Sequence, residues 1–146
     1  MARLVREEGW RIALPSELGW EKAARGGRPD AVYSWGEVPD PNRANYRDSE
    51  IGDTSAVGCF PPNGFGLHDM IGNVWEWTRS HYGSYPYRGD DSRENLKASD
   101  RDPLARGGSW LHDRHLARCA SRYWFPPGAR YYGLGFRVVV RSAPVL

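Results

Sequence analysis

The sequence predicts one α+β domain that is rich in loops, with short mixed β-strands and one or two short helices. Its 146 residues are the length of one ordinary domain. Seven Trp, eight Tyr and four Phe provide large aromatic anchors, whereas 17 Gly and 11 Pro interrupt regular structure along the whole chain. Because only one segment carries clear helix signals, a helical bundle is excluded.

The predicted helix covers residues 17–25. Ser16 precedes it as an N-cap, and Gly26 follows it as a C-cap. Glu21 and Arg25 are spaced for an ion pair on one helix face. Because so short a helix is not stable alone in water, its apolar side chains should pack on the rest of the domain. These side chains are Leu18, Trp20 and Ala24.

The other elements follow in chain order. Residues 29–62 show no sustained periodicity and predict long ordered loops. Residues 73–78 alternate as a strand does, and residues 80–102 are polar and predict a surface excursion. Short strands are predicted at 106–110 and 135–140, with a connecting segment between them.

Composition narrows the classes of partner and chemistry. A net charge of +2 without a basic stretch argues against nucleic-acid binding. No apolar run is long enough to cross a bilayer, and the start of the chain has no signal-peptide core, so no membrane insertion is expected and the localisation stays open. Cys59 and Cys119 form neither a disulfide framework nor a CxxC metal site. We expect both to be small buried residues, with reactivity or pairing as the alternative.

Seven stretches together carry a family resemblance. They are LPSE and WEKAARGG within 14–27, YSWG at 33–36, ANY at 44–46, PPNGFGL at 61–67, IGNVWEW at 71–77, RGGSW at 106–110 and GFR at 135–137. In this order they resemble the formylglycine-generating-enzyme (sulfatase-modifying factor) family, which has a variant of the C-type lectin fold. The resemblance implies one C-type-lectin-like domain over residues 1–146. Relative to the family it is short at the N-terminus, as a minimal form or a fragment would be.

One departure from the family bears on activity. The oxidising members carry two reactive cysteines shortly after the Gly-Gly-Ser-aromatic motif, whereas here the first position falls near His112 and the second has no counterpart. Cys119 matches a cysteine outside that pair. Without a thiol pair there is no copper(I) ligand set and no redox chemistry, so we expect a protein that is not an enzyme.

Residues 106–137 carry a more particular resemblance, to the variable proteins of diversity-generating retroelements. In those proteins adenine-directed mutagenesis varies some positions of a terminal segment and leaves a scaffold fixed. The scaffold here would be 106–110, Arg118, Ala120, Arg122, Pro127, Arg130 and 135–137. The diversified, ligand-binding positions would be Leu111, His112, Asp113, His115, Leu116, Ser121, Tyr123, Trp124, Phe125, Pro126, Ala129, Tyr131, Tyr132, Gly133 and Leu134.

The codons set a test of this reading. Randomising both adenines of AAC or AAT cannot produce Met, Lys, Gln, Glu or Trp. Residues 111–134 contain none of the first four, but Trp124 does not fit, so its template codon must differ or the position is not diversified.

The aromatic residues of this segment have two interpretations. Tyr123 to Phe125 and Tyr131 to Tyr132 offer the rigid amphipathic area that a binding surface needs. Alternatively they belong to the core, and Trp124 is the one that we most expect to be buried. His112 and His115 suit a metal pair or an acid–base role, but their spacing off a helix without a third ligand favours plain surface residues.

The enzyme family also suggests a metal site. Asp69, Gly72, Val74 and Glu76 match positions that bind calcium there, two through side chains and two through backbone carbonyls. The alternative for Glu76 is a buried, hydrogen-bonded carboxylate that anchors the Trp-rich strand. No cofactor is required on this reading, and calcium is the one that the resemblance allows.

These observations predict a non-catalytic ligand-binding protein, a receptor or display protein. Its C-terminal segment would be diversified by a retroelement to bind varied protein or glycan ligands on another cell, phage or host. Arg118, Arg122, Arg130 and Arg137 would hold the loops by charge-assisted hydrogen bonds. The alternatives are a cysteine-less accessory module, a remnant of an iron-dependent sulfoxide synthase, and a sensor domain of a larger polypeptide. The oligomeric state is left open.

Overall fold

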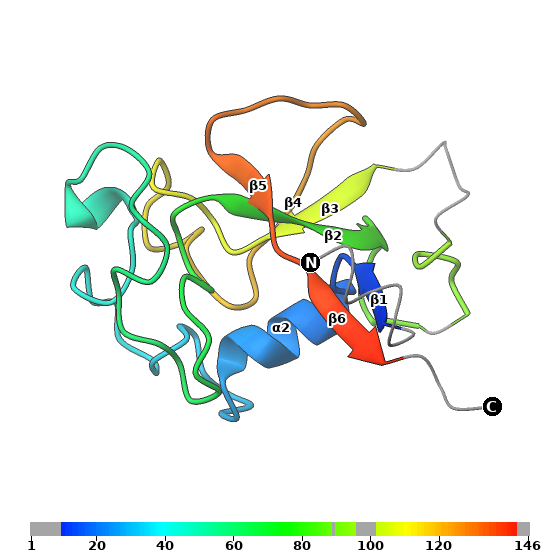
Figure 1. Cartoon of the computed structure of the whole chain (residues 1–146), viewed down its shortest axis with the longest axis horizontal. Coiled ribbons are helices and arrows are strands. Elements are labelled where there is room, and N and C mark those ends of the chain that lie inside the picture. The colour runs from blue at the N-terminus through cyan, green and yellow to red at the C-terminus, as the bar shows by residue number, and fades with distance from the viewer. Residues whose placement is uncertain (1–9, 89, 96–101, 143–146) are drawn as a thin grey trace.

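The computed structural model describes residues 10–88, 90–95 and 102–142. The elements are β1 (Trp10–Ala13), α2 (Glu17–Arg25), the 3-10 helix η1 (Arg47–Ser49), β2 (Trp75–His81), β3 (Pro103–Arg106), β4 (Arg122–Trp124), β5 (Leu134–Phe136) and β6 (Val139–Ser142). Four strands form a sheet in the order β4-β3-β2-β5, in which β5 runs parallel to β2, and β1 pairs with β6 in a separate antiparallel sheet. Helix α2 lies on one side of the four-stranded sheet, and the arch that joins β4 to β5 lies on the other (Figure 1).

The predicted helix is confirmed at both ends. The Ser16 hydroxyl accepts a hydrogen bond from the Gly19 amide at 3.1 Å, and Gly26 ends the helix in the left-handed conformation at φ 58°. Glu21 and Arg25 form the predicted ion pair at 2.7 Å. Local sequence signals therefore fix the bounds of this element.

The buried face of the helix differs from the prediction at one residue. Trp20 and Ala24 are buried as predicted, but Leu18 is 58% exposed. The third side chain on the buried face is that of Glu17, which forms ion pairs beneath the sheet. Since Glu17 fixes the rotation of the helix, Leu18 faces outward and lines an open groove beside Phe65.

The strands agree in part with the prediction. The long loops at 29–62 are confirmed, with η1 as the helical turn among them. The strand predicted at 73–78 is β2, which begins two residues later and ends three residues later. The strand predicted at 106–110 is wrong beyond Arg106, because Gly107 and Gly108 have φ of 99° and 77°, which no strand allows. The strand predicted at 135–140 is two strands, β5 and β6, and β1 and β4 were not predicted.

Three further expectations have outcomes here. The predicted surface excursion at 80–102 is described except for residue 89 and residues 96–101, and two of its side chains, His81 and Arg93, are buried. Most of the N-terminal stretch that was considered for a signal peptide also lies outside the described residues. Cys119 is buried as predicted, whereas Cys59 is exposed, and both are free thiols. No helix in the described part of the chain has the length and apolar character needed to span a bilayer.

The two faces of the four-stranded sheet differ in chemistry. Residues paired across neighbouring antiparallel strands share a face, and successive residues of a strand alternate between faces. Glu76 pairs with Arg106, which pairs with Arg122, and these three project toward α2. The alternate positions place Trp77 and Tyr123 on the opposite face, under the β4–β5 arch. One face is therefore ionic and covered, and the other is aromatic.

Candidate ligand-binding surface

The aromatic face begins at a buried tryptophan. Trp75 is 1% exposed, and its ring lies 5.5 Å from that of His112 and 5.7 Å from that of Tyr123. Phe125 continues the cluster, with its ring 4.9 Å from Tyr123 and 5.6 Å from Trp77. These edge-on and tilted contacts are the arrangements that aromatic rings prefer, so the base of the surface is well packed.

The cluster extends into the β4–β5 arch. The Phe125 ring lies 6.2 Å from Tyr131, and Tyr131 lies 4.6 Å from Tyr132. Tyr132 in turn lies 5.9 Å from Trp110, the scaffold residue just before the predicted variable positions 111–134. Burial raises the pKa of the Tyr131 hydroxyl. A continuous run of rings therefore joins the sheet to the arch.

The outer members of this run are open to solvent. Tyr123 is 48% exposed, Trp124 47% and Tyr132 69%. The expectation that Trp124 is the buried member is wrong, because β4 is the edge strand of the sheet and leaves one side of this ring without a neighbouring strand. Trp124 alternates with Tyr123 along β4, but at the edge of the sheet its ring lies 6.5 Å from that of Tyr123 and is stacked with it. We call Tyr123, Trp124, Phe125, Tyr131 and Tyr132 the aromatic surface.

The other positions of the predicted variable set divide by burial. Exposed are His115, Leu116 and Pro126, and half-buried are Leu111, His112, Asp113, Ala129 and Leu134. Ser121 and Gly133 are buried, so the expectation that they are displayed is wrong. The Gly133 carbonyl accepts the Trp75 amide at 2.7 Å, and a Cβ at Gly133 would lie 3.0 Å from the Ser109 hydroxyl. These two positions belong to the scaffold rather than to the display.

His112 and His115 do not form a metal or acid–base pair. The Nδ1 atom of His112 lies 2.7 Å from the hydroxyl of buried Ser109, and burial, with the nearby Arg47, lowers the pKa of the imidazole. His115 is exposed, and its amide donates to the Asp113 carboxylate at 2.8 Å. In the described parts of the chain, no three His, Cys, Asp or Glu side chains come together as metal ligands.

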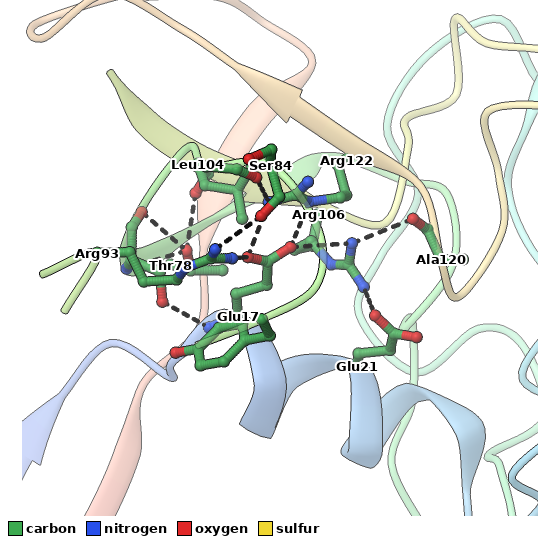
Figure 2. A network of polar contacts seen from close by, with 12 residues as sticks. Glu17, Glu21, Thr78, Ser84, Arg93, Leu104, Arg106, Ala120 and Arg122 are labelled. Atoms are coloured by element: carbon green, nitrogen blue, oxygen red, sulfur yellow. Dashed lines mark hydrogen bonds and ion pairs between the residues drawn. The ribbon is translucent and has the colours of Figure 1, made fainter. Parts of the chain in front are cut away.

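A buried ionic network lies under the opposite face of the sheet (Figure 2). The Glu17 carboxylate, 1% exposed, lies 3.5 Å from both Arg93 and Arg106 and accepts a hydrogen bond from Arg122 at 2.5 Å. The Glu17 amide also donates to the Ser80 hydroxyl at 2.8 Å. One carboxylate at the start of α2 therefore joins three arginines from three parts of the chain.

The network also holds the backbone of the predicted variable segment. Arg106, fully buried, donates to the carbonyls of Cys119 and Ala120 at 2.9 and 3.1 Å, and it pairs with Glu21. The contacts run directly to main-chain atoms. The side chains of this segment can therefore change without removing the carbonyl oxygens that Arg106 binds.

Two of the four predicted scaffold arginines have the predicted role. Arg122 pairs with Glu17 and lies between the rings of Tyr82 and Tyr85, at 4.7 and 4.5 Å from their centroids. Arg137 donates to Glu76. For Arg118 and Arg130 the prediction is wrong: both are exposed, and the described residues provide no hydrogen-bond acceptor for either guanidinium.

The proposed calcium ligands have other partners. Both carboxylate oxygens of Glu76 accept hydrogen bonds from Arg137, at 2.5 and 2.6 Å, and one also accepts the Trp20 indole at 2.6 Å. The Asp69 carboxylate accepts the Gly58 amide at 2.7 Å. Arranged in this way the residues do not fit a calcium ion, because their side-chain oxygens are directed at N–H donors.

Two functional features were missed from the sequence. The first is the ion-pair network: the sequence marks Glu17 only as the first residue of a helix and Arg93 only as part of a polar surface excursion. The second is Phe136, placed in the fixed scaffold, which is 67% exposed and pairs with Trp77 across β2 and β5. Its alternation with Gly135 and Arg137 in an extended segment is the signal that could have placed it outward.

Comparison with known proteins identifies the family. The family model described as the sulfatase-modifying factor enzyme 1-like domain matches residues 3–142. The chain belongs to this family. The domain is 38% identical over 141 residues to the inactive C-alpha-formylglycine-generating enzyme 2 of Bos taurus, covering 85% of this chain and 42% of that protein. It is 31% identical over 147 residues to the formylglycine-generating enzyme of Mus musculus, covering 90% of this chain and 40% of that protein. The domain thus spans about two fifths of the length of these relatives.

Solved structures confirm the predicted fold. Treponema denticola variable protein 1 superimposes with a TM-score of 0.77 at 31% identity, covering 90% of this domain and 48% of that chain. PvdO from Pseudomonas aeruginosa gives a TM-score of 0.76 at 31% identity, covering 97% of this domain and 57% of that chain. The P3c variant of the Major Tropism Determinant, at 16% identity and a TM-score of 0.56, shares the fold. The domain therefore has the formylglycine-generating-enzyme-like variant of the C-type lectin fold, and the predicted resemblance to variable proteins is confirmed.

Proposed function

We propose that this domain is a non-catalytic display protein that binds protein or glycan ligands on another cell, phage or host. Its exposed side chains within 111–134 are varied by a retroelement. The observation that carries the proposal is a half-exposed aromatic surface that follows a backbone stretch, Cys119 and Ala120, held from beneath by the buried Arg106.

The composition of the aromatic surface suits binding. Tyrosine and tryptophan present large contact areas at low cost in conformational entropy, and they dominate the energetics of protein interfaces. Tyr123, Trp124 and Tyr132 retain about half or more of their accessible surface. A ligand that covers these rings removes apolar area from water, which favours association.

The burial of Cys119 supports a role without redox catalysis at this thiol. Cys119 is fully buried, and burial raises the pKa of its thiol to about 11, so it is protonated at neutral pH. The position of the first family cysteine falls near His112, which is bonded to Ser109. An accessory or sensor module of a longer polypeptide is the alternative. The similarity to a relative named as inactive supports this alternative as much as it supports a display protein.

Population sequencing separates these two functions. The DNA encoding residues 106–137, with its genomic neighbourhood, is sequenced across many isolates. We expect variation confined to exposed positions such as Tyr123 and Tyr132, beside a reverse transcriptase and an imperfect template copy. An invariant segment without a template would overturn the proposal and leave a fixed accessory module.

A further inference from the structure

A group of oxygen atoms surrounds the Arg137 side chain, where β5 leads into β6. Its Nε donates to Glu76 at 2.5 Å, and its Nη2 donates to the second Glu76 oxygen at 2.6 Å. The same Nη2 also reaches the backbone carbonyls of Asp69 at 3.0 Å and His68 at 3.2 Å. One carboxylate and two carbonyls thus converge on a single positive charge.

This donor set is of the kind that a hard divalent cation uses. Calcium binds carboxylates, which can be bidentate, together with backbone carbonyls. A guanidinium supplies a permanent charge and N–H groups in a fixed fork, which match a carboxylate in two parallel hydrogen bonds. We infer that the Arg137 guanidinium serves here as an internal cation in place of calcium, so that the domain folds without a divalent ion.

The neighbouring groups exclude a second cation. The Asp69 carboxylate is directed to the Gly58 amide rather than to Glu76. The Trp20 indole occupies one Glu76 oxygen from the side of α2. A calcium ion would therefore meet one negative charge already neutralised by Arg137, and the like charge of the guanidinium would repel it.

The chain at the two predicted carbonyl ligands, Gly72 and Val74, is closely packed through other atoms, which limits how far it could shift toward an ion. Gly72 lies against Asn45, whose carbonyl would be 2.2 Å from a Cβ on Gly72, and Val74 packs on Gly135. Arg137 joins the turn before β2, the strand itself and the β5–β6 connection. One side chain therefore links these three segments.

The first measurement is the melting temperature of the unaltered domain in millimolar CaCl₂ and in excess EDTA. We expect no difference. A site filled to about 100 times its Kd would raise the melting temperature by about 5 to 10 °C. A rise of that size that Glu76→Gln abolishes overturns the inference, whereas a rise that this variant retains comes from another site and leaves the inference standing.

The second measurement asks whether removing the guanidinium creates a metal site. Terbium, a luminescent calcium substitute, is titrated into the unaltered domain, and its emission is excited through Trp20, which touches Glu76. We expect no sensitised emission from the unaltered domain and emission that calcium displaces from Arg137→Ala. Arg130→Ala, which removes an exposed arginine, is the matched control and should stay dark. Displaceable emission from the unaltered domain would overturn the inference even if Arg137→Ala does not fold.

Discussion

Replacing Glu17 tests the buried network most sharply. Glu17→Gln keeps the size of the side chain but removes the negative charge that faces Arg93, Arg106 and Arg122. The carboxylate is 1% exposed, so water cannot replace it. Removing one partner of a buried ion pair costs about 3–5 kcal/mol, because the other charge is left uncompensated. That is a large part of the 5–15 kcal/mol that typical domains have.

Urea unfolding followed by circular dichroism measures this loss. We expect the free energy of unfolding to fall by about 3–5 kcal/mol, equivalent to a melting temperature lower by about 10 °C or more. Asp90→Asn is the control: its ion pair with Arg88 is exposed on both sides and should contribute less than about 1 kcal/mol. If Glu17→Gln lies within about 1 kcal/mol of the unaltered domain, the network does not hold the scaffold and the reasoning fails.

Three further predictions follow from the same geometry. Changing Tyr123, Trp124 and Tyr132 together to Ser should cost only about 1 kcal/mol each in unfolding free energy, since these rings are about half or more exposed; a loss of several kcal/mol per ring in thermal unfolding would place them in the core. Gly72→Ala should unfold the domain or lower its melting temperature severely, because φ is 74° and the new Cβ would lie 2.2 Å from the Asn45 carbonyl; a melting temperature near that of the unaltered domain would show that the close approach is absent. The pKa of His112 is lowered from 6.5, so the unfolded chain binds a proton more readily, and stability should fall as the pH drops below 6.5. The melting temperature of His112→Asn should therefore depend less steeply on pH than that of the unaltered domain. An equally steep dependence would show that His112 is not the group responsible.

Local signals predicted the parts of the fold that local chemistry determines. The bounds of α2 follow from Ser16 and Gly26, whose capping needs no distant partner. The face that α2 buries was not predictable in the same way. Leu18 is exposed because Glu17 is turned inward by Arg122, which is 105 residues away in the chain.

The same limit explains the arginines and the aromatic residues of the candidate site. Arg122 and Arg130 look alike in the sequence, yet only Arg122 has a carboxylate within reach in the described structure. Trp124 is half exposed because β4 lies at the edge of the sheet, and strand order is a property of the whole fold. The residue types of the surface were predictable, whereas their burial depended on tertiary neighbours.

A deep mutational scan of residues 106–137 tests most directly whether exposed surface positions tolerate substitution while buried scaffold positions do not. The variants are displayed on cells and selected for protease resistance. We expect nearly all substitutions to be tolerated at Tyr123, Trp124 and Tyr132, and almost none at Arg106 and Arg122. Equal intolerance at the two groups would contradict the proposal that this domain carries a changeable surface on a fixed base.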